Sequence, residues 1–168
     1  MTRLRTANLL AALATDISER VEEQLKTHPN QTDTAVAALN VMSFWEGITN
    51  SELSRALKLS HTATVRLVDK LELQGLVEAR SGRDLRATHL YLTAAGLKAV
   101  QPALTARCVA VEEYLSSLTS AEEKQLATLL EKIIRPRAID DVAIVHFCRL
   151  CDFTLCRPDK CPMHAGHE

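Results

Sequence analysis

Aromatic residues make up only 4% of this 168-residue chain, while alanine and leucine are abundant, a composition that favours packed helices over a β-sandwich or barrel. No apolar run approaches the ~20 residues that a membrane-spanning helix needs. The first residues, MTRLR, lack the apolar core and cleavage site of a secretory signal. We therefore expect neither a membrane protein nor a signal-directed secreted protein, and a cytoplasmic location. Hydrophobic residues make up 46% of the chain, enough to bury a core.

Net charge is also scarce, because the chain carries only −1 at pH 7. The only segment with a positive balance is 47–91, which has seven Lys or Arg against five Asp or Glu, or +2. If DNA is bound, two copies of this modest positive segment would help to supply the field that makes phosphate contacts favourable.

Apolar residues repeat every three or four positions over much of the chain, which predicts amphipathic helices. The first helix ends before Pro29, and the second spans about 33–45. Shorter helices are expected from Thr49 or Asn50 to Leu57, and from a cap at Ser60, with Val65, Val68 and Leu71 inward, to Gly75. Two further helices are expected after Thr93 and Thr119. Pro102 should kink the first of these or shift its start.

The burial expected in these last two helices follows from the same spacing. Leu97 to Leu118 form a seam close to a coiled coil, in which Cys108 is expected to be a small buried hydrophobe. The final helix is expected to bury Leu126, Leu129, Leu130, Ile133 and Ile134 and to stop before Pro136.

The middle of the chain predicts a winged helix-turn-helix. Two short helices precede two expected strands, 76–80 and 88–92, which are joined by a polar tip. In such a unit the second helix reaches base edges in the major groove, and the wing reaches phosphates or a narrow minor groove. The candidate DNA-binding residues are Ser60, His61, Thr62, Thr64 and Arg66 on that helix, and Arg80, Arg83, Asp84 and Arg86 on the wing.

Over residues 5–140 the chain resembles the MarR family of bacterial transcription regulators. The motifs that carry the resemblance are SELSRAL (51–57), VRLVDKLE (65–72), GLV (75–77), DLRA (84–87) and LTAAG (92–96). The resemblance implies a mainly α fold with a small β-hairpin wing. It also implies a homodimer on a near-palindromic double-stranded operator, and a pairing of Asp84 with Arg86.

On this basis the chain divides into four parts. Residues 1–46 are expected to supply dimerisation and support, 47–92 the DNA-binding domain, 93–140 further dimerisation helices, and 141–168 a cysteine-rich tail. The resemblance also implies a pocket for a small aromatic effector, for which the candidates are His28, Met42, Phe44 and Trp45. A peroxide-sensing cysteine near the N-terminus, which some relatives use, is absent, since no cysteine precedes Cys108.

The remaining four cysteines, Cys148, Cys151, Cys156 and Cys161, fall within the last 21 residues, with His164 as a reserve ligand. Their spacing is that of a zinc knuckle with a cysteine in the place of its histidine, and four thiolates can close a tetrahedron around Zn²⁺. Zinc in a structural role is the leading interpretation. An iron–sulfur cluster, a redox switch and a loose reduced tail remain as alternatives.

These features predict a dimeric DNA-binding repressor that responds to a ligand or to metal. The alternative is a zinc-stabilised protein-interaction module that uses the winged fold without DNA, which the near-neutral charge favours. We do not expect an enzyme, because four thiolates leave zinc no open position for water and no nucleophile–base pair is evident.

Overall fold

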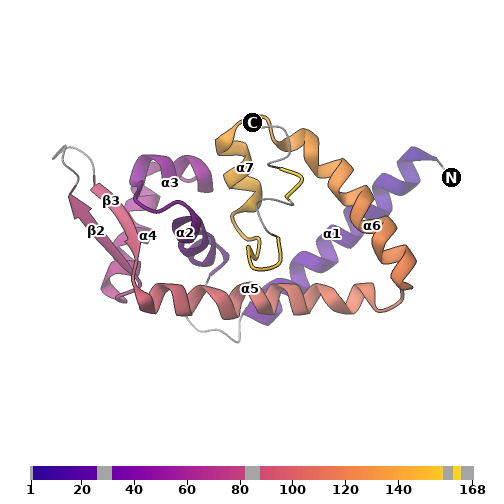
Figure 1. The fold of residues 1–168 in the computed structure, drawn as a ribbon, viewed down its shortest axis with the longest axis horizontal. Helices are drawn as coiled ribbons and strands as arrows, with labels where there is room; N and C mark the ends of the chain where they lie inside the picture. Colours follow the sequence, from indigo (N-terminus) through magenta and orange to yellow (C-terminus); the bar gives the residue numbers. More distant parts are fainter. Residues whose placement is uncertain (1, 26–31, 82–87, 157–160, 164–168) are drawn as a thin grey trace.

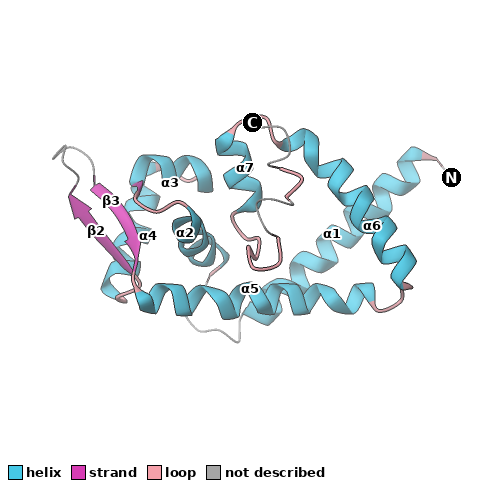
Figure 2. Ribbon diagram, viewed as in Figure 1, coloured by secondary structure: helices cyan, strands magenta, loops and turns pink. Residues whose placement is uncertain are grey.

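The computed structural model describes residues 2–25, 32–81, 88–156 and 161–163. Within these ranges the fold is mainly helical with one small antiparallel sheet at one end (Figure 2), which confirms the expected fold class. In chain order the elements are α1 (Arg3–Leu25), α2 (Asp33–Phe44), β1 (Ile48–Thr49), α3 (Asn50–Leu57), α4 (His61–Leu73), β2 (Val77–Ser81), β3 (Thr88–Leu92), α5 (Ala94–Leu115), α6 (Ser120–Ile134), a 3₁₀ turn (Arg135–Arg137) and α7 (Asp141–Cys148).

Side-chain caps fix where several helices begin, because they satisfy backbone N–H groups that have no partner in the first turn. Thr49 forms a capping box with Glu52: the Thr49 hydroxyl accepts from the Glu52 N–H, and the Glu52 carboxylate accepts from the Thr49 N–H at 2.8 Å. These hydrogen bonds, led by the one from the Thr49 backbone, lower the pKa of Glu52. Thr119 forms the same capping box with Glu122 at the start of α6, as expected. Ser60, also expected as a cap, accepts one N–H at the start of α4, and Thr93 does so at the start of α5.

The sheet has the strand order β1-β3-β2. Strands β2 and β3 form the expected hairpin, whose tip at 82–87 lies outside the described residues. The short strand β1 is not among the elements that the sequence predicts. It pairs with the opposite edge of β3 and places Ile48 beside Leu90, both fully buried, so the hairpin is anchored to the helical core.

Helix α5 is the longest element after α1 and runs from the end of the sheet to the turn before α6 (Figure 1). The winged unit (α2, α3, α4 and the sheet) lies toward one end of α5, and α6 and much of α1 lie toward the other. Pro102 sits inside α5, which begins at Ala94, so of the two expected effects, a kink or a shifted start, the shifted start is excluded.

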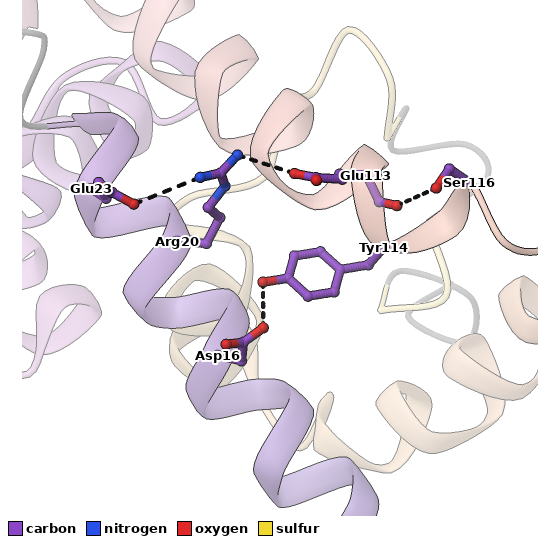
Figure 3. A network of polar contacts seen from close by, with 6 residues as sticks. All are labelled: Asp16, Arg20, Glu23, Glu113, Tyr114 and Ser116. Carbon is purple, nitrogen blue, oxygen red and sulfur yellow. Dashed lines mark hydrogen bonds and ion pairs between the residues drawn. The ribbon is translucent and has the colours of Figure 1, made fainter.

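Polar contacts hold α1 against α5 (Figure 3). The Tyr114 hydroxyl donates to the Asp16 carboxylate at 2.6 Å, and Arg20 pairs with Glu113 at 3.1 Å and with Glu23 at 3.7 Å. Because these groups are exposed, they contribute less to stability than the buried Val21 and Leu25 beside them.

The core surrounds α2, in which every residue from Ala35 to Met42 is buried. Two sequence expectations about burial fail in the single chain. Helix α6 has no buried residue, and Leu129 and Ile133 are each 56% exposed. Cys108 is exposed rather than buried in the seam of α5. Burial of these residues would require another surface to cover them, and a single copy of the chain does not provide one.

Helix α7 lies in the tail, for which the sequence predicts no helix. Asp140 caps it through a 2.7 Å bond from the Ala143 N–H, and it packs against α3 of the winged unit. In the described part of the chain, no helix combines the length and the apolar character that a membrane crossing requires.

Gly96 provides a test of this packing. A Cβ atom at Gly96 would overlap the carbonyl oxygen of Leu76, where the chain leaves α4 for the wing. We expect Gly96→Ala to lower the free energy of unfolding by about 3 kcal/mol, because a backbone oxygen cannot easily move aside. Gly75→Asn is the matched control. Gly75 has φ +69° with open space around it, a conformation that asparagine tolerates, so the cost should be under about 1 kcal/mol. Equal urea midpoints for the two variants would contradict the close approach.

Candidate functional site: the winged helix and the cysteine cluster

Helix α4 presents one exposed polar face and one buried face. Ser60, His61, Thr62 and Arg66 are exposed, as a helix that reads DNA requires. The prediction for Thr64 is wrong, since Thr64 is fully buried and its hydroxyl donates to the carbonyl of Ser60 at 3.1 Å. The physical reason is the helical period, which places Thr64 on the same buried face as Val68 and Leu71.

The described part of the wing carries one candidate, Arg80. Its guanidinium donates two hydrogen bonds to the Glu78 carboxylate, at 3.0 and 3.1 Å, and lies 4.5 Å from the centre of the Tyr91 ring. The pairing lowers the pKa of Glu78 and raises the pKa of Arg80. A phosphate would therefore have to compete with Glu78 for Arg80. Arg83, Asp84 and Arg86 lie outside the described residues.

Lys58 adds a positive charge that the sequence analysis does not single out. It adopts the left-handed conformation (φ 54°) at the end of α3, and its N–H bonds back to the carbonyls of Arg55 and Ser54. This turn sets the direction of α4 relative to α3. Arg55 in the last turn of α3 and Lys58 directly after it are both exposed, and their place at the end of a short capped helix is the signal in the sequence that could have found them.

An apolar pocket of about 390 Å³ lies between the end of α2 and the tail. Its lining residues are Phe44, Trp45, Asp141, Ile144, Val145, Cys148 and Phe153. Two of the four predicted effector residues, Phe44 and Trp45, line this pocket. Met42 does not, because it is buried in the core of α2, and His28 lies outside the described residues.

The four tail cysteines lie in one cluster. Cys148 and Cys161 are buried together with Ile144 and Met163, and the half-buried Cys151 and Cys156 pack against them. Cys148 and Cys151 influence each other's ionisation, and Cys156 interacts with Cys161 and Cys151.

The pairing and the burial shift the acidity of these thiols. The hydrogen bond from Cys148 lowers the pKa of Cys151 to about 7, whereas the same bond together with burial raises the pKa of Cys148. Burial raises the pKa of Cys156 to about 11. Across the described residues, no three or more His, Cys, Asp or Glu side chains already stand in a metal-binding arrangement. The reserve ligand His164 lies outside those residues.

Three side chains attach the cysteine segment to the rest of the molecule. The Asn40 amide, in the middle of α2, donates to the carbonyls of Arg149 (3.1 Å) and Cys151 (2.9 Å). His146 on α7 donates from Nδ1 to the carbonyl of Ala56 at the end of α3 (2.9 Å), and burial lowers its pKa. Gln101 on α5 donates to the Asp152 carboxylate at 2.8 Å.

Comparison with known proteins agrees with this geometry. Residues 32–87 match the profile described as MarR family. Within this chain, the segment that includes the winged helix is therefore similar to the MarR family. Proteins of that family are transcription regulators, which agrees with the expectation that the chain is not an enzyme.

Among curated proteins, the chain is similar to the transcriptional repressor MprA of Escherichia coli K12, with 35% identity over 85 residues. That match covers 50% of this chain and 48% of MprA, so the chain spans about half the length of the curated relative.

Solved structures share the MarR-type fold over a longer stretch. A MarR family protein from Bacillus stearothermophilus is 25% identical, with a TM-score of 0.69 over 81% of this chain and 98% of its own. A mutant of MepR from S. aureus, solved bound to an oligodeoxyribonucleotide, is 18% identical, with a TM-score of 0.58 over 77% of this chain and 95% of its own.

Proposed function

We propose that this chain is a DNA-binding transcriptional regulator, a repressor that acts as a homodimer. The observation that carries the proposal is the exposed polar face of α4, which includes Thr62 and Arg66. This helix belongs to the segment that matches the MarR family. Helix α4 has the length and the polar face that suit a major groove. The similarity to the repressor MprA and to a fold solved with an oligodeoxyribonucleotide supports the proposal.

Electrostatics are consistent with this surface. Arg55, Lys58, Arg66 and Lys70 are exposed on α3, α4 and the turn that joins them, within the only segment that has a positive balance. Phosphate contacts from such side chains position a protein on DNA, while the polar groups of Thr62 and His61 are of the kind that read base edges.

The exposed apolar faces support the dimer. Leucines in the first half of α1 and the aliphatic residues of α6 are solvent-exposed in one copy: Leu4, Leu9, Leu10, Leu13, Leu129, Leu130 and Ile133. A monomeric soluble protein rarely exposes so many large apolar residues on two helices. A two-fold dimer that covers them would set two α4 helices about 34 Å apart, one turn of DNA, which matches a near-palindromic operator.

Repression needs a signal that releases the DNA, and the apolar pocket offers a place for one. A small aromatic compound fits its composition, since Phe44, Trp45 and Phe153 provide ring faces and Asp141 is a polar group at the lining. Because residues of α2 and α7 line the pocket, a bound compound would change how the winged unit packs against the tail.

The second candidate is a protein-interaction module that uses the winged fold without DNA. The net charge of −1 and the pairing of Arg80 with Glu78 favour it. Salt dependence separates the two functions, because DNA contacts release counterions and give a steep loss of affinity with salt.

The DNA proposal predicts a specific effect of Arg66. We expect Arg66→Ala to weaken binding to a duplex from the DNA that flanks its own gene by about 1–3 kcal/mol, and a lost phosphate contact would reduce the salt slope by about 1. Fluorescence anisotropy over a range of salt concentrations measures both quantities. Arg137→Ala, on the turn after α6, is the matched control and should change neither. If the two variants have the same DNA affinity and the same salt slope, α4 does not contact DNA as proposed.

The dimer proposal predicts that charge on α6 separates the copies. Leu129→Glu combined with Ile133→Glu should turn a dimer into a monomer in sedimentation at micromolar concentration, because four buried carboxylates would face each other at the interface. Leu73→Glu changes an exposed leucine on α4 and should leave the dimer intact. A wild-type monomer at that concentration would contradict the proposal.

The effector proposal predicts that a small phenolic compound changes the fluorescence of Trp45, which is the only tryptophan in the chain. Ile144→Phe should abolish the saturable change, since the larger ring fills the pocket. A saturable change of the same size in this variant would place the compound elsewhere.

A further inference from the structure

We propose that Cys148, Cys151, Cys156 and Cys161 bind one zinc ion and that its binding changes the affinity of the winged unit for DNA. The second half of this proposal rests on the proposed function, and the first half does not. The carrying observation is that the four thiols share one cluster, while that same segment is hydrogen-bonded to α2, α3 and α5.

The four thiols lie in one cluster. Cys148 interacts electrostatically with all three other cysteines. The turn between Cys148 and Cys151 is tight, since the Cys151 N–H bonds to the Cys148 carbonyl at 2.8 Å. The ion would draw together four side chains that are already neighbours.

Two polar groups near the cluster, the Asp152 carboxylate and Nδ1 of His146, already have hydrogen-bond partners. The Asp152 carboxylate accepts from Gln101, from the Thr154 N–H at 2.9 Å and from the Thr154 hydroxyl at 2.6 Å. The Nδ1 of His146 is bound to Ala56. An all-sulfur set within an apolar wall of Ile144 and Met163 suits a thiophilic ion such as Zn²⁺ rather than Mg²⁺ or Ca²⁺.

Zinc would bind as four thiolates at ~2.3 Å, and each bound thiol would give up its proton to the solvent. The interactions among the thiols would be replaced by four bonds to one ion. This change tightens the segment from the end of α7 onward, where Asn40 holds the carbonyls of Arg149 and Cys151.

These hydrogen bonds connect the zinc site to the winged unit, which is proposed to bind DNA. Asn40 lies in the buried helix α2, and His146 fixes α7 to the end of α3, one turn before α4. The apolar wall of the cluster also includes Ile134 and Ala138, at the end of α6 and just beyond it. The ion therefore lies where the winged unit meets the proposed dimer helices, and a shift there changes the spacing of the two α4 helices.

The test uses the full chain, purified under reducing conditions, stripped of metal with a chelator and titrated with zinc alone. We expect one zinc per chain, and cobalt in its place should give the thiolate charge-transfer absorption and visible bands of a tetrahedral site. Cys161→Ser should weaken zinc binding tenfold or more, while Cys108→Ser, the exposed cysteine outside the cluster, should not. Absence of bound zinc, or iron bound in its place, would overturn the site.

A second arm measures the affinity for duplex DNA with and without zinc. We expect a change of fivefold or more in the wild type, and a smaller change in Asn40→Leu, a variant that keeps the cysteines but loses the amide. If zinc binds but the zinc-bound and zinc-free proteins have equal affinity for DNA, the coupling is overturned while the zinc site stands. Zinc bound with no DNA binding in either state would overturn the proposed function and the coupling together.

Discussion

The structure depends on the buried amide of Asn40. Asn40 is 2% exposed and stands in the middle of α2, between the buried Leu39 and Val41. A buried amide without partners costs about 1–3 kcal/mol, and its two hydrogen bonds to the carbonyls of Arg149 and Cys151 offset that cost. The C-terminal segment is consequently part of the core, although it is more than a hundred residues away along the chain.

Docking of this segment explains other features near the winged unit. Helix α7 covers the end of α3, and Phe153 packs its ring 4.4 Å from that of Phe44, so the apolar pocket forms between α2 and the tail. The cysteines follow directly in sequence and are gathered at the same place. A tail whose sequence offers few apolar residues is ordered here by contacts with the winged unit as well as by its own cluster.

Much of the fold follows from local sequence. The caps at Thr49, Ser60 and Thr119 and the apolar periodicity predict the helix boundaries, because both signals act within one or two turns. Thr64 is the exception on α4. Its polar side chain suggests a DNA contact, but its spacing of four from Val68 places it on the buried face, and the helical period decides.

Other features depend on contacts that no local pattern contains. Strand β1 exists because β3 offers it a free edge, and α7 is ordered by α3. The exposed Cys108 and the exposed apolar face of α6 show that a heptad-like seam indicates an apolar surface without indicating which chain covers it. The residues at 82–87 and His164, among the sequence candidates, lie outside the described part of the structure.

Amide hydrogen exchange of the full chain, with and without zinc, tests the link between tail and winged unit most directly. If the contacts of Asn40 and His146 couple them, zinc will slow exchange both in 141–151 and in the amides of α2 and α3. Slower exchange confined to the tail, with α2 and α3 unchanged, would contradict the coupling.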